Sequence, residues 1–194
     1  MTQGERTRAR LLEATAHVVA QRGYRRARVD DIVRLADTSH GTFYLYFPNR
    51  EEAFRALAHD AADEMAALAD TIGPIGPGPD GVAELRSFLG RFLATYEAHG
   101  AVIRTWAENQ VDDHELIVLG LDTMGGIGAA LRARMQEAGV EHLPEPELAT
   151  TVLLGTVERL VYFATSRPLA LDVEALLDEL APMLHRGFFT PATA

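Results

Sequence analysis

The stretch that decides the fold runs from Thr38 to Arg50 and reads TSHGTFYLYFPNR. Ser39 stands where its hydroxyl can accept a hydrogen bond from the first N–H groups of a short helix, which have no partner inside the helix. Phe43 and Phe47 lie four residues apart and therefore share one face of that helix. A helix of about two turns is not stable alone in water. Other segments must therefore pack behind its two phenylalanines.

Two amphipathic segments just before this stretch carry the apolar faces that can support it. Residues 6–22 have apolar side chains at helical spacing, and Gly23 follows as a helix-ending residue. Residues 29–36 repeat the pattern, and Asp37 follows, one of the few residue types other than glycine that adopt left-handed backbone geometry. Two helices, a turn of about three residues and a short third helix form a helix-turn-helix unit.

This part of the chain resembles the TetR family of bacterial transcriptional repressors, from the N-terminus to about residue 55. The resemblance is carried by Val29-Asp30-Asp31-Ile32, by the residues from Ser39 to Phe47, and by Asn49-Arg50-Glu51-Glu52. It implies that the short helix enters the major groove of DNA. It also implies a homodimer that presents two such helices to a palindromic operator.

Three positions depart from the family pattern and change the expected chemistry. Arg28 replaces a helix-opening Thr or Ser, so a capping oxygen is lost and a cation for phosphate is gained. Asp37 replaces the usual glycine of the turn. His40 stands where a lysine often stands and can still donate to a base or a phosphate. The DNA sequence that this helix reads therefore cannot be taken from the family.

The resemblance assigns DNA contacts residue by residue. Gly41 allows close approach to DNA, and Thr42 offers a hydroxyl and a methyl group to the groove. Arg50 opens the next helix, where its side chain and the helix N-terminus both favour phosphate. For Tyr44 and Tyr46 the alternative is packing against the first helix. The expected set is Arg28, Ser39, His40, Gly41, Thr42, Tyr44, Tyr46 and Arg50.

The distribution of charge supports a nucleic-acid partner even though the net charge is −10. Residues 1–50 hold nine arginines against five acids, a balance of +4. Residues 51–194 hold nine arginines against 23 acids, a balance of −14. A basic N-terminal segment on an acidic remainder is typical of a protein that contacts phosphate at one end only.

The composition argues against several other classes of protein. The chain has no cysteine, which excludes disulfides, thiolate metal sites and cysteine catalysis. No unbroken apolar run of about 18 residues and no signal segment is present, so we expect a cytoplasmic protein without a membrane span. Catalytic motifs and phosphate-binding glycine loops are absent too, and the acidic run at 112–115 is interpreted as a helix start, not a metal site. We expect no enzyme activity, no cofactor and no metal.

The rest of the chain predicts a helical body, which makes the fold all-α. Helices are expected over 50–70, 82–98, 102–109, 112–139, 147–166 and 172–186, and the Pro- and Gly-rich segment 71–81 is expected to be a loop. Four glycines inside 112–139 indicate a kink, close packing or a break. The expected domains are a helix-turn-helix domain over 1–50 and a ligand-binding and dimerisation domain over 51–194.

Two functional surfaces are expected in this body. A helix that is apolar on nearly every side, as 147–166 is, needs covering by a partner subunit, and the family resemblance implies the same. The expected interface residues are Val152, Gly155, Thr156, Arg159, Leu176, Leu180 and Leu184. The expected lining of a pocket for a small apolar or aromatic effector, with ordinary core packing as the alternative, is Phe88, Phe92, Tyr96, Trp106, Leu121, Met124, Tyr162 and Phe163.

These expectations combine into one function. The chain is expected to be a homodimeric repressor that an effector releases from operator DNA by shifting the population of head spacings. One alternative keeps the same DNA-binding head but gives it an activating role or no small-molecule effector. An alternative of another class is a helical enzyme or carrier, which would lack DNA binding with a steep salt dependence.

Overall fold

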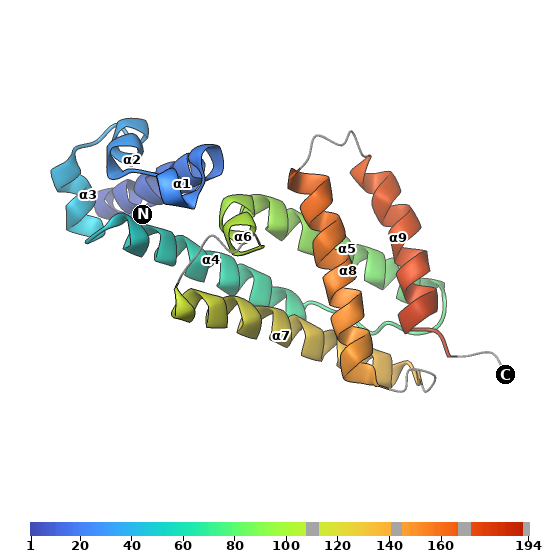
Figure 1. Cartoon of the computed structure of the whole chain (residues 1–194). Coiled ribbons are helices and arrows are strands. Elements are labelled where there is room, and N and C mark those ends of the chain that lie inside the picture. Colours follow the sequence, from blue (N-terminus) through green and yellow to red (C-terminus); the bar gives the residue numbers. More distant parts are fainter. Residues whose placement is uncertain (108–112, 141–144, 167–171, 192–194) are drawn as a thin grey trace. The chain divides into compact units, whose positions relative to one another are not determined.

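The computed structural model describes residues 1–107, 113–140, 145–166 and 172–191, and within these ranges every regular element is a helix (Figure 1). The prediction of an all-α fold that starts with a three-helix helix-turn-helix unit is confirmed. The elements are α1 (Gln3–Arg22), η1 (Tyr24–Arg26), α2 (Val29–Leu35), α3 (His40–Tyr46), α4 (Arg50–Asp70), α5 (Pro79–Ala98), α6 (Gly100–Ala107), α7 (His114–Glu137), α8 (Pro146–Ser166) and α9 (Val173–Phe188).

Two helices begin earlier than the sequence pattern predicts. Helix α1 starts at Gln3 because Thr2 and Glu5 form a capping box, in which the Thr2 hydroxyl accepts from the Glu5 N–H at 3.2 Å and the Glu5 carboxylate accepts from the Thr2 N–H at 2.6 Å. Helix α5 starts at Pro79, so the loop predicted up to residue 81 ends earlier. Proline is well suited to the first turn of a helix because the N–H that it lacks has no partner there.

The chain forms two compact units. Unit 1 consists of Met1–Asp63 and His99–Gly120, and unit 2 consists of Glu64–Ala98 and Leu121–Ala194. The boundary passes through α4 and through α7, so each of these helices contributes one end to each unit. The division into 1–50 and 51–194 stays a prediction.

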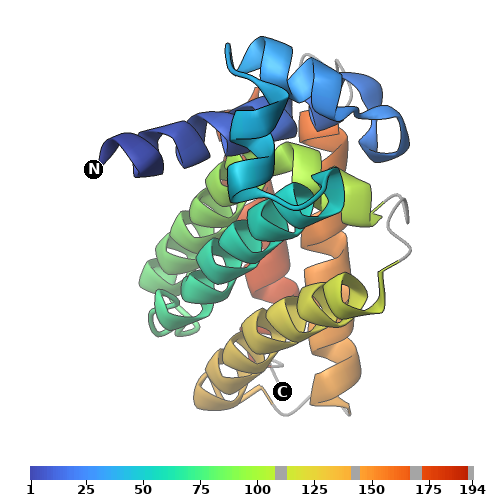
Figure 2. The ribbon, with the colours of Figure 1, turned by 90° about the vertical axis from the view of Figure 1, so that its left-hand side faces the viewer.

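The core of unit 1 holds the short helix α3 in place. Figure 2 shows α1, α2 and α3 (blue to light blue) gathered together. Phe43 and Phe47 are 0% and 3% exposed, which confirms their predicted core positions. Helix α6 and the start of α7 add Val102 and Leu116 to the same cluster. The supporting side chains from α1, α2 and α4 are Leu11, Leu12, Val18, Val19, Ile32, Val33 and Phe54.

The core of unit 2 is built around α5, which packs against α8 and α9. Phe88, Phe92 and Tyr96 form an aromatic row along α5, with ring centroids 6.1 Å and 6.4 Å apart, and each is at most 1% exposed. Helix α9 packs against α5 and carries a buried apolar stripe, which consists of Leu177, Leu180, Ala181 and Leu184. These residues recur three or four positions apart, as expected for one face of a helix.

The glycines of α7 do not break the helix. Helix α7 is continuous from His114 to Glu137. A β-carbon at Gly128 would lie 3.5 Å from Thr150 Cγ2 and 3.8 Å from Leu154 Cδ2, at ordinary contact distance, and β-carbons at Gly125 and Gly126 would meet no atom within 4 Å. Of the three outcomes predicted for this glycine cluster, the structure therefore excludes a break.

The loop between α4 and α5 is fastened at its centre. The Gly76 carbonyl oxygen accepts a hydrogen bond of 2.8 Å from Nε2 of His185, which is buried on α9 and stacks on Phe189. Any side chain at Gly81 would collide with the same carbonyl group, so glycine is required there. Gly73 N–H also donates to Glu84 at 2.9 Å. A segment rich in proline and glycine is thus held in one conformation.

Helices α7 and α8 have the length and apolar composition of membrane spans, with mean hydropathy 1.4 over His114–Glu137 and 1.2 over Pro146–Thr165. Length and composition alone are weak evidence, because the core helices of soluble proteins meet the same criterion. Helix α8 packs against α5 and α9, which accounts for part of its apolar surface without a membrane.

Candidate nucleic-acid interface

The turn before α3 has left-handed backbone geometry at Asp37, with φ of 47°. Two contacts support this geometry. The guanidinium of Arg10, from α1, donates to the carbonyl oxygens of Ala36 and Asp37, which are left without partners where α2 ends. Thr38 N–H donates to the Val33 carbonyl at 3.0 Å. The role of Arg10 is therefore to fix the turn that aims α3.

Helix α3 begins with the predicted cap. Ser39 Oγ accepts a hydrogen bond of 3.1 Å from the Thr42 N–H and lies 3.0 Å from the Thr42 hydroxyl. On the buried side, the guanidinium of Arg8 lies 5.5 Å above the ring of Phe47. Helix α1 therefore contributes both apolar packing and a cation–π contact behind α3.

The opposite side of α3 is open to solvent. Tyr44 is 54% exposed, and its ring packs edge-on against Phe43 with centroids 5.5 Å apart. His40 and Gly41 are exposed, and Thr42 is half-buried. Leu45 is 83% exposed, and it is not among the predicted DNA contacts. Its place between two tyrosines on the expected recognition helix is a signal that could have identified it, because an apolar side chain can contact the methyl group of thymine.

Tyr46 is positioned differently from Tyr44. It is half-buried, and its hydroxyl lies so close to Gly4 of α1 that a β-carbon there would be 3.5 Å away. This is the packing against the first helix that we considered as the alternative. A DNA contact by the Tyr46 hydroxyl stays a prediction.

The side chain of Arg50 makes its contacts within unit 1. Its guanidinium donates to the carbonyl oxygens of Ala27 at 2.7 Å and Tyr24 at 3.2 Å, and to Glu51 Oε1 at 3.1 Å. It also lies 5.1 Å above the ring of Tyr24. With these partners Arg50 ties the start of α4 to the segment between α1 and α2. Its contact with phosphate stays a prediction.

Arg28 is exposed and makes no capping bond at the start of α2, as expected of an arginine at that position. Its charge is available at the surface. Arg22 of α1 instead reaches α2, where it pairs with Asp31 at 3.0 Å. Asp31 also pairs with Arg34 at 3.4 Å. These pairs compensate one of the two acids that the basic segment carries at this helix start.

The other acid, Asp30, contacts α3 directly. His40 Nε2 lies 2.6 Å from Asp30 Oδ1. This hydrogen bond from His40, helped by the charges of Arg34 and Arg28, lowers the pKa of the Asp30 carboxyl. Asp30 is thus an ionised group at the exposed edge where α2 meets α3.

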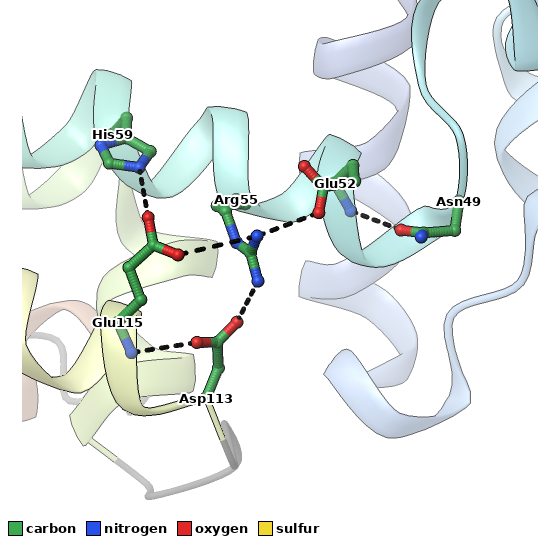
Figure 3. A network of polar contacts seen from close by, with 6 residues as sticks. All are labelled: Asn49, Glu52, Arg55, His59, Asp113 and Glu115. Atoms are coloured by element: carbon green, nitrogen blue, oxygen red, sulfur yellow. Dashed lines mark hydrogen bonds and ion pairs between the residues drawn. The ribbon is translucent and has the colours of Figure 1, made fainter.

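Unit 1 contains a second polar network, between α4 and the start of α7 (Figure 3). Arg55 donates to Glu52 at 3.0 Å and to Asp113 at 2.6 Å, and it lies 3.7 Å from Glu115. Glu115 also lies 3.8 Å from His59. The neighbouring Asp112 lies outside the described residues. In the described part of the chain, no group of three or more acidic or histidine side chains is arranged to hold a metal ion.

The residues predicted to line an effector pocket are divided between the two units. Trp106 belongs to unit 1 and packs against its core, whereas the others belong to unit 2. Phe88, Phe92 and Tyr96 are core residues of α5. Tyr162 and Phe163 are half-buried neighbours on α8, with centroids 5.9 Å apart.

Leu121 and Met124 do line a groove, which lies between α7 and α8 and has a volume of about 550 Å³. Its lining includes several small residues and three charged ones. Arg132 pairs with Glu147 at 2.8 Å, and Glu158 is the third charged residue of the lining. The remaining lining residues are Gly125, Gly128, Ala129, Thr150, Thr151, Leu154 and Gly155.

The residues predicted for a dimer interface fall into two groups. On α8, Val152 is 52% exposed, and Gly155, Thr156 and Arg159 are exposed too. Leu148, one turn before Val152, is 59% exposed. On α9, Leu176 is half-buried, while Leu180 and Leu184 are 9% and 7% exposed within the protomer. In the part of the chain that the structure describes, the α8 group therefore forms an exposed face, whose apolar members are Leu148 and Val152.

Helices α1 to α3 define the class of this protein: it carries a helix-turn-helix domain with an exposed third helix. The sequence profile described as "Bacterial regulatory proteins, tetR family" matches residues 11–57. The helix-turn-helix domain of this chain is therefore similar to those of the TetR family of bacterial regulatory proteins.

The chain is also similar to known regulators in sequence, and to solved structures in fold. An HTH-type transcriptional regulator, YdgC of Bacillus subtilis (strain 168), is 34% identical over 71 residues, which cover 37% of this chain and 36% of that protein. A fatty acid metabolism regulator protein of the same organism is 24% identical over 91% of this chain and 93% of its own length. The crystal structure of FadR from Bacillus subtilis in complex with stearoyl-CoA has a TM-score of 0.69 at 19% identity, covering 91% of this chain and 96% of that one.

Proposed function

We propose that this protein is a homodimeric transcriptional repressor that binds a palindromic operator through α3 and leaves it when a small apolar effector binds to unit 2. The observation that carries the proposal is the open side of α3, where His40, Tyr44 and Leu45 are exposed above a buried Phe43 and Phe47. A recognition helix needs this combination, because one side must be anchored while the other enters the groove.

DNA binding is tested with double-stranded DNA from around the gene itself, by fluorescence anisotropy at several salt concentrations. Wild-type protein should bind with an affinity that falls steeply with salt, because bound phosphates release counterions. Tyr44→Ala should weaken binding at least tenfold, and Leu45→Ala should weaken it at sites with thymine. Gln21→Ala, near the end of α1, is the matched control and should bind normally. No salt-dependent retention of any such DNA would overturn the proposal.

The dimer is supported by the exposed apolar face of α8. Leu148, Val152, Gly155, Thr156 and Arg159 repeat at helical spacing along this face. Val152→Arg should convert the dimer into monomers in light scattering after gel filtration, because it buries an unpaired charge in the interface. Gln136→Arg introduces the same charge at an exposed site of α7 and should leave the dimer intact. A wild-type monomer at micromolar concentration would contradict the proposal.

The groove between α7 and α8 is the site we propose for the effector. Its apolar side chains and small lining residues suit an elongated apolar molecule. Stearoyl-CoA is the ligand in the similar FadR structure. Gly125 lines the groove and Gly126 does not, and added β-carbons at both would meet nothing. Gly125→Phe should therefore abolish binding of the dye anilinonaphthalene sulfonate, and Gly126→Phe should not. Equal binding by both variants would place the effector elsewhere, and covering of the groove by a partner subunit would show as dye exclusion from the wild-type dimer.

A regulator is favoured over an enzyme because the similar proteins are regulators. Repression is favoured over activation by the family resemblance alone. A cytoplasmic location follows from the proposed DNA partner. In a reporter assay, deletion of the gene should raise expression from the adjacent promoter. A fall in expression would favour the activator alternative.

A further inference from the structure

The contact between His40 and Asp30 joins the two helices that form the proposed DNA-reading surface. His40 is the first residue of α3, and Asp30 lies in the first turn of α2. His40 Nε2 lies 2.6 Å from Asp30 Oδ1, while the two side chains are 54% and 65% exposed. The pair is therefore exposed to solvent, and the contact between Nε2 and Oδ1 joins its two side chains.

This single contact decides which nitrogen of the neutral imidazole carries the proton. An ionised carboxylate can only accept hydrogen bonds, and Asp30 is kept ionised because the bond from His40 lowers its pKa. The hydrogen must therefore lie on Nε2. In neutral His40 the other nitrogen, Nδ1, then presents a lone pair and no proton, so it acts as an acceptor.

Several other charged groups lie near the His40–Asp30 pair. Arg28 and Arg34 of α2 act on Asp30 through their charge. Asp31 is already paired with Arg22 of α1 and with Arg34, and Asp37 lies in the turn before α3. No other acid, histidine or arginine occurs between His40 and Tyr46. His40 is therefore the only acid, histidine or arginine on α3.

The two charge states of His40 match different bases. The first residues of a recognition helix face the base edges. An acceptor at Nδ1 pairs with the amino group of adenine or cytosine in the major groove, whereas a donor at Nδ1 pairs with N7 of either purine, O6 of guanine or O4 of thymine, and finds no acceptor on cytosine. Protonation turns Nδ1 from acceptor into donor without breaking the bond from Nε2 to Asp30.

We propose that Asp30 is a positioning residue that fixes the tautomer of His40, so that His40 reads an amino-bearing base when neutral and a base with a major-groove acceptor when protonated. One base position in each half-site of the operator then depends on pH. This inference rests on the proposed DNA binding through α3.

The experiment is selection of bound duplexes from a library with a randomised segment, with the full-length protein at about pH 6 and about pH 8, the range in which histidines change charge. At the higher pH, one position should be enriched in adenine or cytosine, and at the lower pH cytosine should give way to guanine or thymine at the same position. Duplexes that differ only there should change their relative affinity roughly tenfold between the two conditions, the size expected of one base contact.

Variants separate this role from a structural one. His40→Gln should select one sequence at both pH values, because glutamine does not titrate. Asp30→Asn should lose the preference for adenine or cytosine at the higher pH, because an amide can either donate or accept and no longer fixes the tautomer. Asp30→Glu should restore it. An identical selected sequence for wild-type protein at both pH values would overturn the inference alone, whereas selection of no sequence at either pH would overturn the proposed DNA binding itself.

Discussion

Arg55 of α4 and Asp113, the residue before α7, are joined by a hydrogen bond of 2.6 Å, and the second oxygen of Asp113 accepts from the Glu115 N–H at 3.1 Å. One carboxylate therefore caps α7 and holds it to α4 (Figure 3). The Arg55 guanidinium lowers the pKa of Asp113 below its ordinary 3.8. A depressed carboxyl pKa contributes stability that is present above about pH 4 and is lost as pH falls through the folded-state value.

Asp113→Asn should therefore destabilise the protein near neutral pH and lose that disadvantage in acid. Asparagine caps a helix about as well as aspartate, so the substitution removes the charge and keeps the cap. Urea unfolding of both proteins at a series of pH values between about 3 and 7 measures the difference. Asp63→Asn, at an exposed position of α4, should give no such trend. A difference between wild type and Asp113→Asn that is constant with pH would show that the ion pair does not stabilise the fold.

Substitutions at Ser39 should separate its capping role from a contact with DNA. Ser39→Ala removes the acceptor of the Thr42 N–H and should cost about 1 kcal/mol of the free energy of unfolding. Ser39→Asp keeps a capping oxygen and should retain that stability, but its negative charge beside phosphate should weaken DNA binding at least tenfold. Unfolding curves and anisotropy titrations of the two variants give the two quantities. Normal DNA binding by Ser39→Asp would place Ser39 away from the phosphates.

The left-handed backbone at Asp37 makes a third prediction. Glycine adopts φ of 47° freely, whereas alanine is strained there and has no side-chain oxygen to support the turn. Asp37→Gly should therefore be more stable than Asp37→Ala by about 1 kcal/mol. The comparison of the two variants by thermal unfolding is independent of the lost carboxylate, which both lack. Equal stability would mean that the turn changes its geometry in both.

The fourth prediction concerns the fastening of the loop between α4 and α5. His185→Leu should cost about 1–3 kcal/mol of the free energy of unfolding, because the half-buried Gly76 carbonyl loses its donor. His185→Gln can place an amide N–H near the position of Nε2 and should recover part of this loss. Proteolysis within residues 71–78 should be faster in the leucine variant. An unchanged cleavage rate would show that the hydrogen bond is not what holds the loop.

The sequence predicted the helix-turn-helix unit well because its signals are local. The spacing of Phe43 and Phe47, the cap at Ser39 and the turn residue Asp37 act within a few residues of one another, and the structure contains all of them. The contacts of Arg50 could not be predicted in the same way. Its acceptors are the backbone carbonyls of Tyr24 and Ala27, and backbone groups leave no mark in a sequence.

The predicted effector pocket shows a second limit. A row of aromatic residues at helical spacing fits both a ligand site and a core, and the choice depends on which helices lie opposite. On α5 the row is covered within unit 2, while Trp106 packs with unit 1. The exposure of Leu45 was not predicted, because an apolar side chain is exposed only where no other element packs against it, and its own sequence does not show this.

The bond between His185 and Gly76 joins residues that are 109 positions apart. During synthesis, the loop between α4 and α5 leaves the ribosome long before its partner on α9 does, and α5 likewise waits for the apolar stripe that α9 packs against it. The residues up to Phe54, in contrast, hold most of the core of the helix-turn-helix unit. The nascent chain is therefore expected to shape its DNA-reading surface early and to close unit 2 only when the last helix emerges, so that unit 2 would depend on chaperones for longer.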